Sequence, residues 1–169
     1  MTGSRIPTHG FGMGWFVRMI YRGLVWKERQ RAQRASSSSV ELSLTPAHLD
    51  IGERGEMLAY WYLRQAGYNI VARNLRARLG SAELDLVGWD GPVLAFVEVK
   101  TRSSLDGGPP EAAVSAVKHK QKRIVKAANE YMRQLGRKPV SYRFDIASVT
   151  WDPSGGYHIE RLIKDAFKG

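Results

Sequence analysis

The chain has 169 residues, enough for one domain with a buried core and a short extension. It carries 26 Lys and Arg against 16 Asp and Glu, and this net charge of +10 favours an anionic partner such as nucleic acid or an acidic membrane surface. The absence of cysteine excludes a disulfide scaffold, a zinc knuckle and a thiol nucleophile. Arg18 and Arg22 interrupt the most apolar N-terminal run. We therefore expect neither a membrane span nor a secretory signal, and a cytoplasmic protein.

The positive charge is concentrated near the N-terminus. Residues 1–34 contain seven basic residues and one acid, and a run of four serines follows as a linker. The composition predicts a basic extension over residues 1–44, partly helical or disordered, and a folded domain over residues 45–169. A basic amphipathic helix within residues 14–34 would suit a membrane surface or nucleic-acid phosphates, and a disordered leader explains the same composition.

The folded domain begins with a helix signal and continues with strands. Thr45-Pro46 is a typical helix start and Gly67 a typical stop, which predicts a helix to about Gln65. Asp90-Gly91 is typical of a two-residue hairpin. The order is α-β-β-β-α-β-β, with strands at 68–78, 83–89, 93–101, 140–150 and 157–163 and a second helix at 112–135.

Carboxylates interrupt the apolar faces of two neighbouring strands. Side chains two apart on a strand share a face, so Glu98 and Lys100 follow the core position Phe96. Glu83 and Asp85 share a face of the preceding strand. With Asp90-Gly91 as the turn, position 85 pairs near 96 and position 83 near 98. The four charged side chains are therefore predicted to converge on one patch.

Crowded carboxylates repel one another unless a cation or a shared proton compensates their charge. Oxygen ligands suit Mg²⁺ or Mn²⁺, and a nearby lysine such as Lys100 can orient an attacking water or neutralise charge on a phosphoryl group. The pattern thus predicts metal-dependent phosphodiester hydrolysis. A cross-strand ladder of ion pairs, worth a few tenths of a kcal/mol per pair, is the alternative interpretation.

The first helix offers a further carboxylate. Glu56 follows the apolar stripe that contains Ala59 and Leu63, so a helix packed on the sheet could aim it at the same patch. Gly52 and Gly55 would let that turn approach another backbone closely. A partly exposed glutamate that the helix dipole favours is the alternative.

The second helix combines a buried polar residue with a row of lysines. Gln121 falls inside the apolar stripe, and Lys118, Lys122 and Lys126 follow one another at intervals of four on an adjoining face. Such a row suits a phosphate backbone, although a solvated face has the same composition. The scarcity of acids on this helix favours binding.

Motifs over residues 52–167 resemble those of the YraN-like family of bacterial proteins. They are Gly52-x-x-Gly55-Glu56, Gly67-Tyr68-x-Ile70, Asn74-x-Arg76, Glu83-Leu84-Asp85-Leu86-Val87 and Phe96-Val97-Glu98-Val99-Lys100-Thr101-Arg102. That family is similar to Holliday-junction resolvases, within the restriction-endonuclease-like superfamily and its PD-(D/E)xK signature. The resemblance implies a central mixed sheet flanked by helices and a Mg²⁺-dependent nuclease site. One departure is Ala82-Glu83, where a Gly-Glu step is usual.

The resemblance also implies roles for single residues. Asp85, Glu98 and Glu56 would be metal ligands, and Lys100 the catalytic lysine. Accessory roles would fall to Glu83 and Gln121, and phosphate binding to Arg102, Lys118, Lys122 and Lys126. We expect DNA rather than RNA as the substrate, and a homodimer is one expectation because many enzymes of this architecture act as dimers. The competing hypothesis is a non-catalytic nucleic-acid-binding or adaptor module with the same fold.

Overall fold

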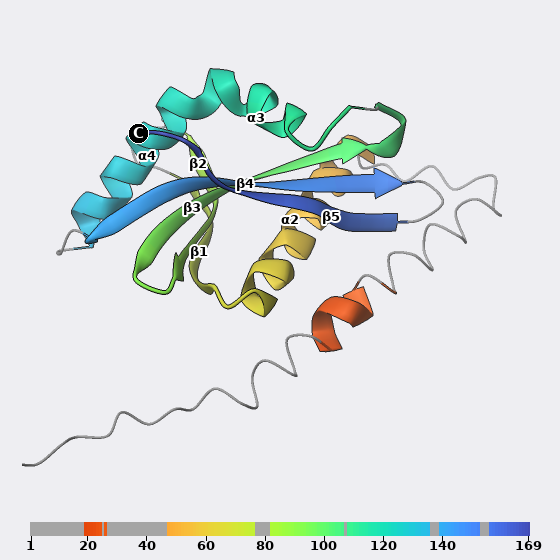
Figure 1. The fold of residues 1–169 in the computed structure, drawn as a ribbon, viewed down its shortest axis with the longest axis horizontal. Helices are drawn as coiled ribbons and strands as arrows, with labels where there is room; N and C mark the ends of the chain where they lie inside the picture. The colour runs from red at the N-terminus through yellow and green to blue at the C-terminus, as the bar shows by residue number, and fades with distance from the viewer. Residues whose placement is uncertain are drawn as a thin grey trace, which may run out of the picture.

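The computed structural model describes residues 19–24, 26, 47–76, 82–106, 108–135, 139–152 and 156–169. A five-stranded sheet forms the centre, with strands in the order β1-β2-β3-β4-β5. They are β1 (Asn69–Arg76), β2 (Glu83–Asp90), β3 (Val93–Ser103), β4 (Ser141–Asp152) and β5 (Gly156–Phe167). The helices are α2 (Ala47–Gln65), α3 (Ala112–Val117) and α4 (Gln121–Gln134). The predicted mixed sheet flanked by helices is confirmed (Figure 1).

The N-terminal extension is described only at residues 19–24 and 26, which are helical. Its Tyr21 ring lies 6.0 Å from the ring of Tyr62 on α2. The predicted Thr45-Pro46 helix start and the serine linker lie outside the described residues. None of the helices in the described part of the chain combines the length and apolar character that a bilayer crossing requires.

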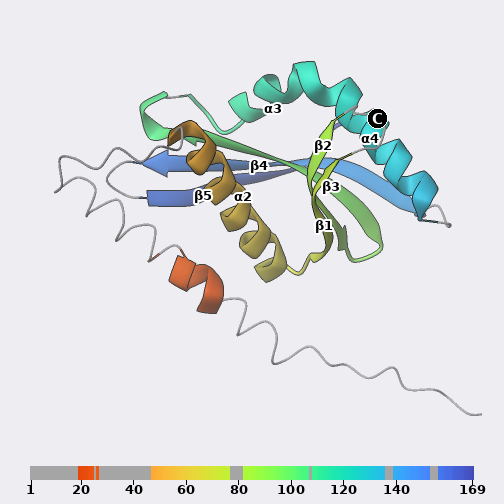
Figure 2. The same ribbon diagram turned by 180° about the vertical axis from the view of Figure 1, so that it is seen from behind.

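Helix α2 covers one face of the sheet, and Figure 2 shows it lying across β4 and β5. Its buried residues Leu58, Ala59 and Leu63 pack against the side chains of that face, including Val97. The helix ends as predicted at Gly67, whose φ of +95° lies in the left-handed region that glycine adopts without strain. The chain therefore turns sharply into β1.

The second helix is interrupted, which corrects the prediction of one helix over 112–135. A 3₁₀ turn, Lys118–Lys120, separates α3 from α4. Val117 and Ile124 are buried against the opposite face of the sheet, and the six residues between them contain no apolar side chain. No core contact holds this stretch in regular α-helix, and the chain therefore winds into the tighter 3₁₀ conformation there.

The β2–β3 hairpin turns at Gly91-Pro92 rather than at Asp90-Gly91. Asp90 pairs with Val93, and Gly91 has a φ of +58°. Proline lacks an N–H for the ladder, so it lies in the turn instead of opposite Trp89. The register therefore differs by two residues from the predicted one. Because two is the period of a strand, the shift by itself does not exchange the two faces of the hairpin, although Leu84 packs in the same core cluster as Val87 and not in that of Leu86.

Strand β3 continues beyond its pairing with β2. The β2–β3 register runs from Asp90↔Val93 to Leu86↔Val97, whereas parallel pairing of β3 with β4 reaches Ser103↔Trp151. The two strands β2 and β3 therefore part at the residues that follow Val97. This is the part of the sheet in which the predicted site residues lie.

Candidate active site

Asp85 lies where β2 leaves β3. Its Oδ2 atom accepts a hydrogen bond from the Val99 backbone N–H at 2.8 Å. The side chain thus takes the place that a backbone carbonyl of β2 would occupy in a continued ladder. The predicted pairing of position 85 with position 96 is wrong, because Phe96 pairs with Val87. Asp85 instead lies close enough to Glu98 for their charges to interact.

Asp85 and Glu98 form a crowded acidic pair. Glu98 is buried and Asp85 is half-buried. Burial is the largest cause that raises the pKa of Asp85, to about 7, and the negative charge of Glu98 is the second. The Val99 N–H opposes this rise, and the charge of Glu56 adds to it. The charge of Lys120 lowers the pKa. Asp85 therefore lies in a desolvated place beside a second carboxylate.

Lys120 reaches this pair from the 3₁₀ turn. Its Nζ atom lies 3.2 Å from Glu98 Oε1, and the Glu98 side chain is only 5% exposed. Sequence periodicity could not single out Lys120, because a regular helix gives no reason to prefer it over its lysine neighbours. The interruption of the helix after Val117 is what places Lys120 beside the sheet.

Glu56 approaches from α2, on the other side of the sheet. Its Oε2 atom accepts a hydrogen bond from Asn74 Nδ2 at 2.9 Å. Gly55 permits the approach, since a Cβ there would lie 1.9 Å from Thr101 Oγ1 on β3. The same expectation for Gly52 is wrong, because its Cβ would meet nothing within 4 Å.

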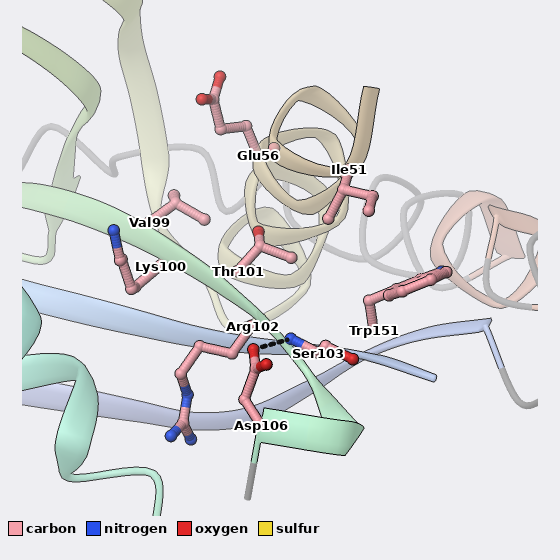
Figure 3. A pocket seen from close by; sticks show the side chains of 10 residues that line it. Ile51, Glu56, Val99, Lys100, Thr101, Arg102, Ser103, Asp106 and Trp151 are labelled. Atoms are coloured by element: carbon pink, nitrogen blue, oxygen red, sulfur yellow. Dashed lines mark hydrogen bonds between the residues drawn. The ribbon is translucent and has the colours of Figure 1, made fainter. Parts of the chain in front are cut away.

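Two cavities meet at Glu56. The first, of about 510 Å³, is lined by Glu53, Glu56, Asn74, Arg76, Ala82, Glu83, Asp85, Lys120, Arg123 and Ile124. The second, of about 340 Å³, is lined by Ile51, Gly52, Glu56, Val99, Lys100, Thr101, Arg102, Ser103, Asp106 and Trp151 (Figure 3). Asp85 and Lys100 thus border neighbouring cavities that share Glu56. Sequence reasoning did not select Asn74 and Arg123 as site residues.

The remaining predicted residues lie in differing surroundings. Glu83 lines the first cavity and forms an exposed ion pair with Arg76 at 3.4 Å. Arg102 pairs with Glu160 at 3.1 Å, and its side chain is 15% exposed, so it is less available to a phosphate than predicted. Gln121 is the first residue of α4 and is half-buried, outside the lining of both cavities.

The predicted lysine row is exposed. Lys118 belongs to the 3₁₀ turn, whereas Lys122 and Lys126 belong to α4. Arg123 lies between them in sequence and lines the first cavity together with Lys120. Positive side chains therefore continue from the acidic pair onto the surface of α4.

The donor chemistry of the acidic pair fits a hard divalent cation. Asp85 and Glu98 offer neighbouring carboxylate oxygens in a partly desolvated place, and Glu56 borders the same cavity as Asp85. Within the described residues, no three His, Asp or Glu side chains gather closely enough to hold a metal ion by themselves. A cation held by two of these carboxylates would need further oxygen ligands, such as water or a phosphate.

Fold and site together define a mixed α/β protein with an acidic cavity at a split in its sheet. The model of the family described as "Uncharacterised protein family UPF0102" matches residues 55–149, and the chain belongs to this family. A UPF0102 protein of Solibacter usitatus is 54% identical over 98 residues, 58% of this chain and 73% of the relative. A UPF0102 protein of Symbiobacterium thermophilum is 45% identical over 117 residues, 69% of this chain and 95% of the relative. The predicted YraN-like family membership is thereby confirmed.

Proposed function

We propose that this protein is a metal-dependent nuclease that hydrolyses phosphodiester bonds in DNA. The observation that supports the proposal most is the acidic pair, Asp85 and Glu98, where β2 leaves β3. The motif resemblance to the restriction-endonuclease-like superfamily, which includes these same two residues, also supports it. The proposal gives both carboxylates a reason to lie together despite their repulsion.

The acidic pair and the residues that line the two cavities would divide the reaction between them. Asp85 and Glu98, with Glu56 across the cavity, would hold Mg²⁺ or Mn²⁺. Such an ion supplies Lewis-acid stabilisation of the phosphoryl charge and lowers the pKa of a bound water. Lys100 would orient the attacking water from the neighbouring cavity.

Positive side chains would hold the DNA backbone during this reaction. Lys120 and Arg123 line the first cavity, and Lys122 and Lys126 extend the positive charge along the exposed face of α4. Contacts of this kind to phosphates position a nucleic acid without reading its sequence. We therefore expect binding that weakens steeply with salt.

A cleavage panel tests the proposal. The protein is incubated with branched, duplex and single-stranded DNA in Mg²⁺ or Mn²⁺, beside Asp85→Asn, Glu98→Gln and Lys100→Met. We expect each variant to lose cleavage by about 100-fold or more. Glu111→Gln is the control, because Glu111 is an exposed carboxylate that pairs with Arg161 away from both cavities. Cleavage that survives in all three variants would contradict the proposal.

The Lys120–Glu98 ion pair favours a second candidate, a nucleic-acid-binding or adaptor module without catalysis. The ammonium group already compensates part of the buried carboxylate charge. Calorimetric titration with Mn²⁺ separates the two candidates. Binding that disappears in Asp85→Asn and Glu98→Gln supports the nuclease, and absence of such binding in the unmodified protein supports the module.

A further inference from the structure

The second cavity differs in chemistry from the acidic one. Ile51 and Trp151 give it apolar walls, and Lys100 contributes a cation. Asp106 also lines it and accepts a hydrogen bond from the Ser103 N–H at 3.0 Å, which fixes its carboxylate (Figure 3). Lys100 would attract a phosphate, but the carboxylates of Glu56 and Asp106 would repel it, and the indole would offer it nothing. A flat, partly apolar group with N–H donors matches these walls better.

We propose that this cavity binds one unpaired nucleobase of single-stranded DNA, stacked on the indole of Trp151. The inference rests on the proposed nuclease function, because Glu56 lines both this cavity and the acidic one. Aromatic side chains are the usual stacking surfaces for single-stranded nucleic acid. The carboxylate of Asp106 accepts hydrogen bonds from the amino or imino groups of the base.

The indole is held by the sheet. Trp151 pairs with Ser103 of β3 on one side and with Tyr157 of β5 on the other. The Tyr157 ring lies 6.5 Å from the indole, and the Trp151 side chain remains half-buried. A ring fixed in this way loses little conformational entropy when a base stacks on it.

The size of the cavity admits one base. A volume of about 340 Å³ lies at the lower end of the range of about 300–1,000 Å³ that is typical of small-molecule sites. A base within a duplex is stacked and paired, and it must leave the helix to reach such a cavity. The site therefore favours DNA with an unpaired nucleotide next to the phosphate that is cleaved.

The test measures binding without metal. Fluorescence anisotropy in EDTA compares a labelled single-stranded oligonucleotide with a series in which one nucleotide at a time is abasic. We expect the unmodified protein to bind the intact strand more tightly than at least one abasic strand, by about 5- to 100-fold. Trp151→Ala should bind the intact strand and that abasic strand with equal affinity. Trp151→Phe should keep most of the difference in affinity between them.

Two further variants serve as a second test of the indole and as a control. Trp151→Leu keeps apolar bulk without an aromatic face, so it should also lose the difference even if Trp151→Ala does not fold. Trp61→Leu is the matched control on α2, outside both cavities, and should keep the full preference for the intact strand. A preference for the intact strand that survives in a folded Trp151→Leu protein overturns the proposal. So does equal affinity of the unmodified protein for all strands.

The outcome is separable from that of the proposed nuclease function. Base binding is measured in EDTA, whereas cleavage is tested with metal and the Asp85 and Glu98 variants. Loss of the base preference in Trp151→Leu, with no cleavage detected, would support the base site and contradict the nuclease. Cleavage that depends on Asp85, with no base preference, would contradict only the base site.

Discussion

The carboxylate of Asp85 and the backbone N–H of Val99 are joined by a hydrogen bond of 2.8 Å. This bond ends the β2–β3 pairing with a side chain instead of a backbone carbonyl. Residues from α2 and from the 3₁₀ turn lie on opposite faces of the sheet, and both approach Asp85 at this split. The separation of the two strands is what allows Glu56 and Lys120 to line one cavity.

Two substitutions of Asp85 separate its structural role from its charge. Asp85→Asn keeps an acceptor for Val99 and removes one of two crowded charges, so the free energy of unfolding should stay the same or rise by about 1 kcal/mol. Asp85→Ala leaves the Val99 N–H without its acceptor and should lower stability by about 1–2 kcal/mol. Urea unfolding at pH 8 in EDTA measures both. Equal destabilisation by the two variants would contradict this account.

Lys120 should support the fold through Glu98. Lys120→Met leaves a buried carboxylate without its ion-pair partner, and we expect a loss of about 1–2 kcal/mol, moderated because the lysine is 44% exposed. Lys122→Met, at an exposed position two residues later, should change stability by less than about 0.5 kcal/mol. Thermal unfolding in EDTA compares them. In a parallel measurement without EDTA, added Mn²⁺ should reduce the loss of stability of Lys120→Met if the acidic pair binds the ion. Identical melting temperatures of the two variants would refute the role given to Lys120.

Gly55 and Gly52 form a matched pair on α2. Gly55→Ala places a methyl group against Thr101 and should lower the free energy of unfolding by about 1–3 kcal/mol. Gly52→Ala meets nothing within 4 Å and should raise it by about 0.5–1 kcal/mol through helix propensity. Chemical denaturation measures both, and Thr101→Ala should partly rescue Gly55→Ala. Similar effects of the two glycine substitutions would show that the close approach to β3 is unimportant.

Asp90 should give stability a dependence on acid pH. Hydrogen bonds from Lys164, at 2.7 Å, and from Arg143, at 2.6 Å, lower the pKa of Asp90 in the folded state. Because the folded pKa lies below the unfolded value, its contribution is present above about pH 4 and disappears as the pH falls through the folded pKa. Asp90→Asn should therefore lower stability by about 1 kcal/mol at pH 7, and by less as the pH approaches 3.

Urea unfolding of both proteins across this pH range tests the expectation. Asp165→Asn is the control, because Asp165 forms its ion pair with the neighbouring Lys168 at an exposed position. A difference between the Asp90 variant and the unmodified protein that stays constant down to pH 3 would contradict the expected linkage.

The sequence determined the succession of elements and the faces of their side chains. Strand alternation predicted that Asp85 and Glu98 lie near one another, and the two-residue shift in register left this proximity intact. Gly67 ended α2 as predicted, since only a residue that tolerates positive φ suits that position. These are local properties, which composition and periodicity encode directly.

Tertiary structure decided which side chains meet. The point at which β2 leaves β3 depends on competition between backbone and side-chain partners, and no periodic pattern reports it. Lys120 reaches Glu98 because the core contacts Val117 and Ile124 but not the residues between them. Arg102 pairs with Glu160, which is 58 residues away in sequence. Contacts between segments this distant follow from packing of the whole sheet. For that reason the candidate carboxylates could be identified from the sequence alone, whereas their partners are known only from the fold.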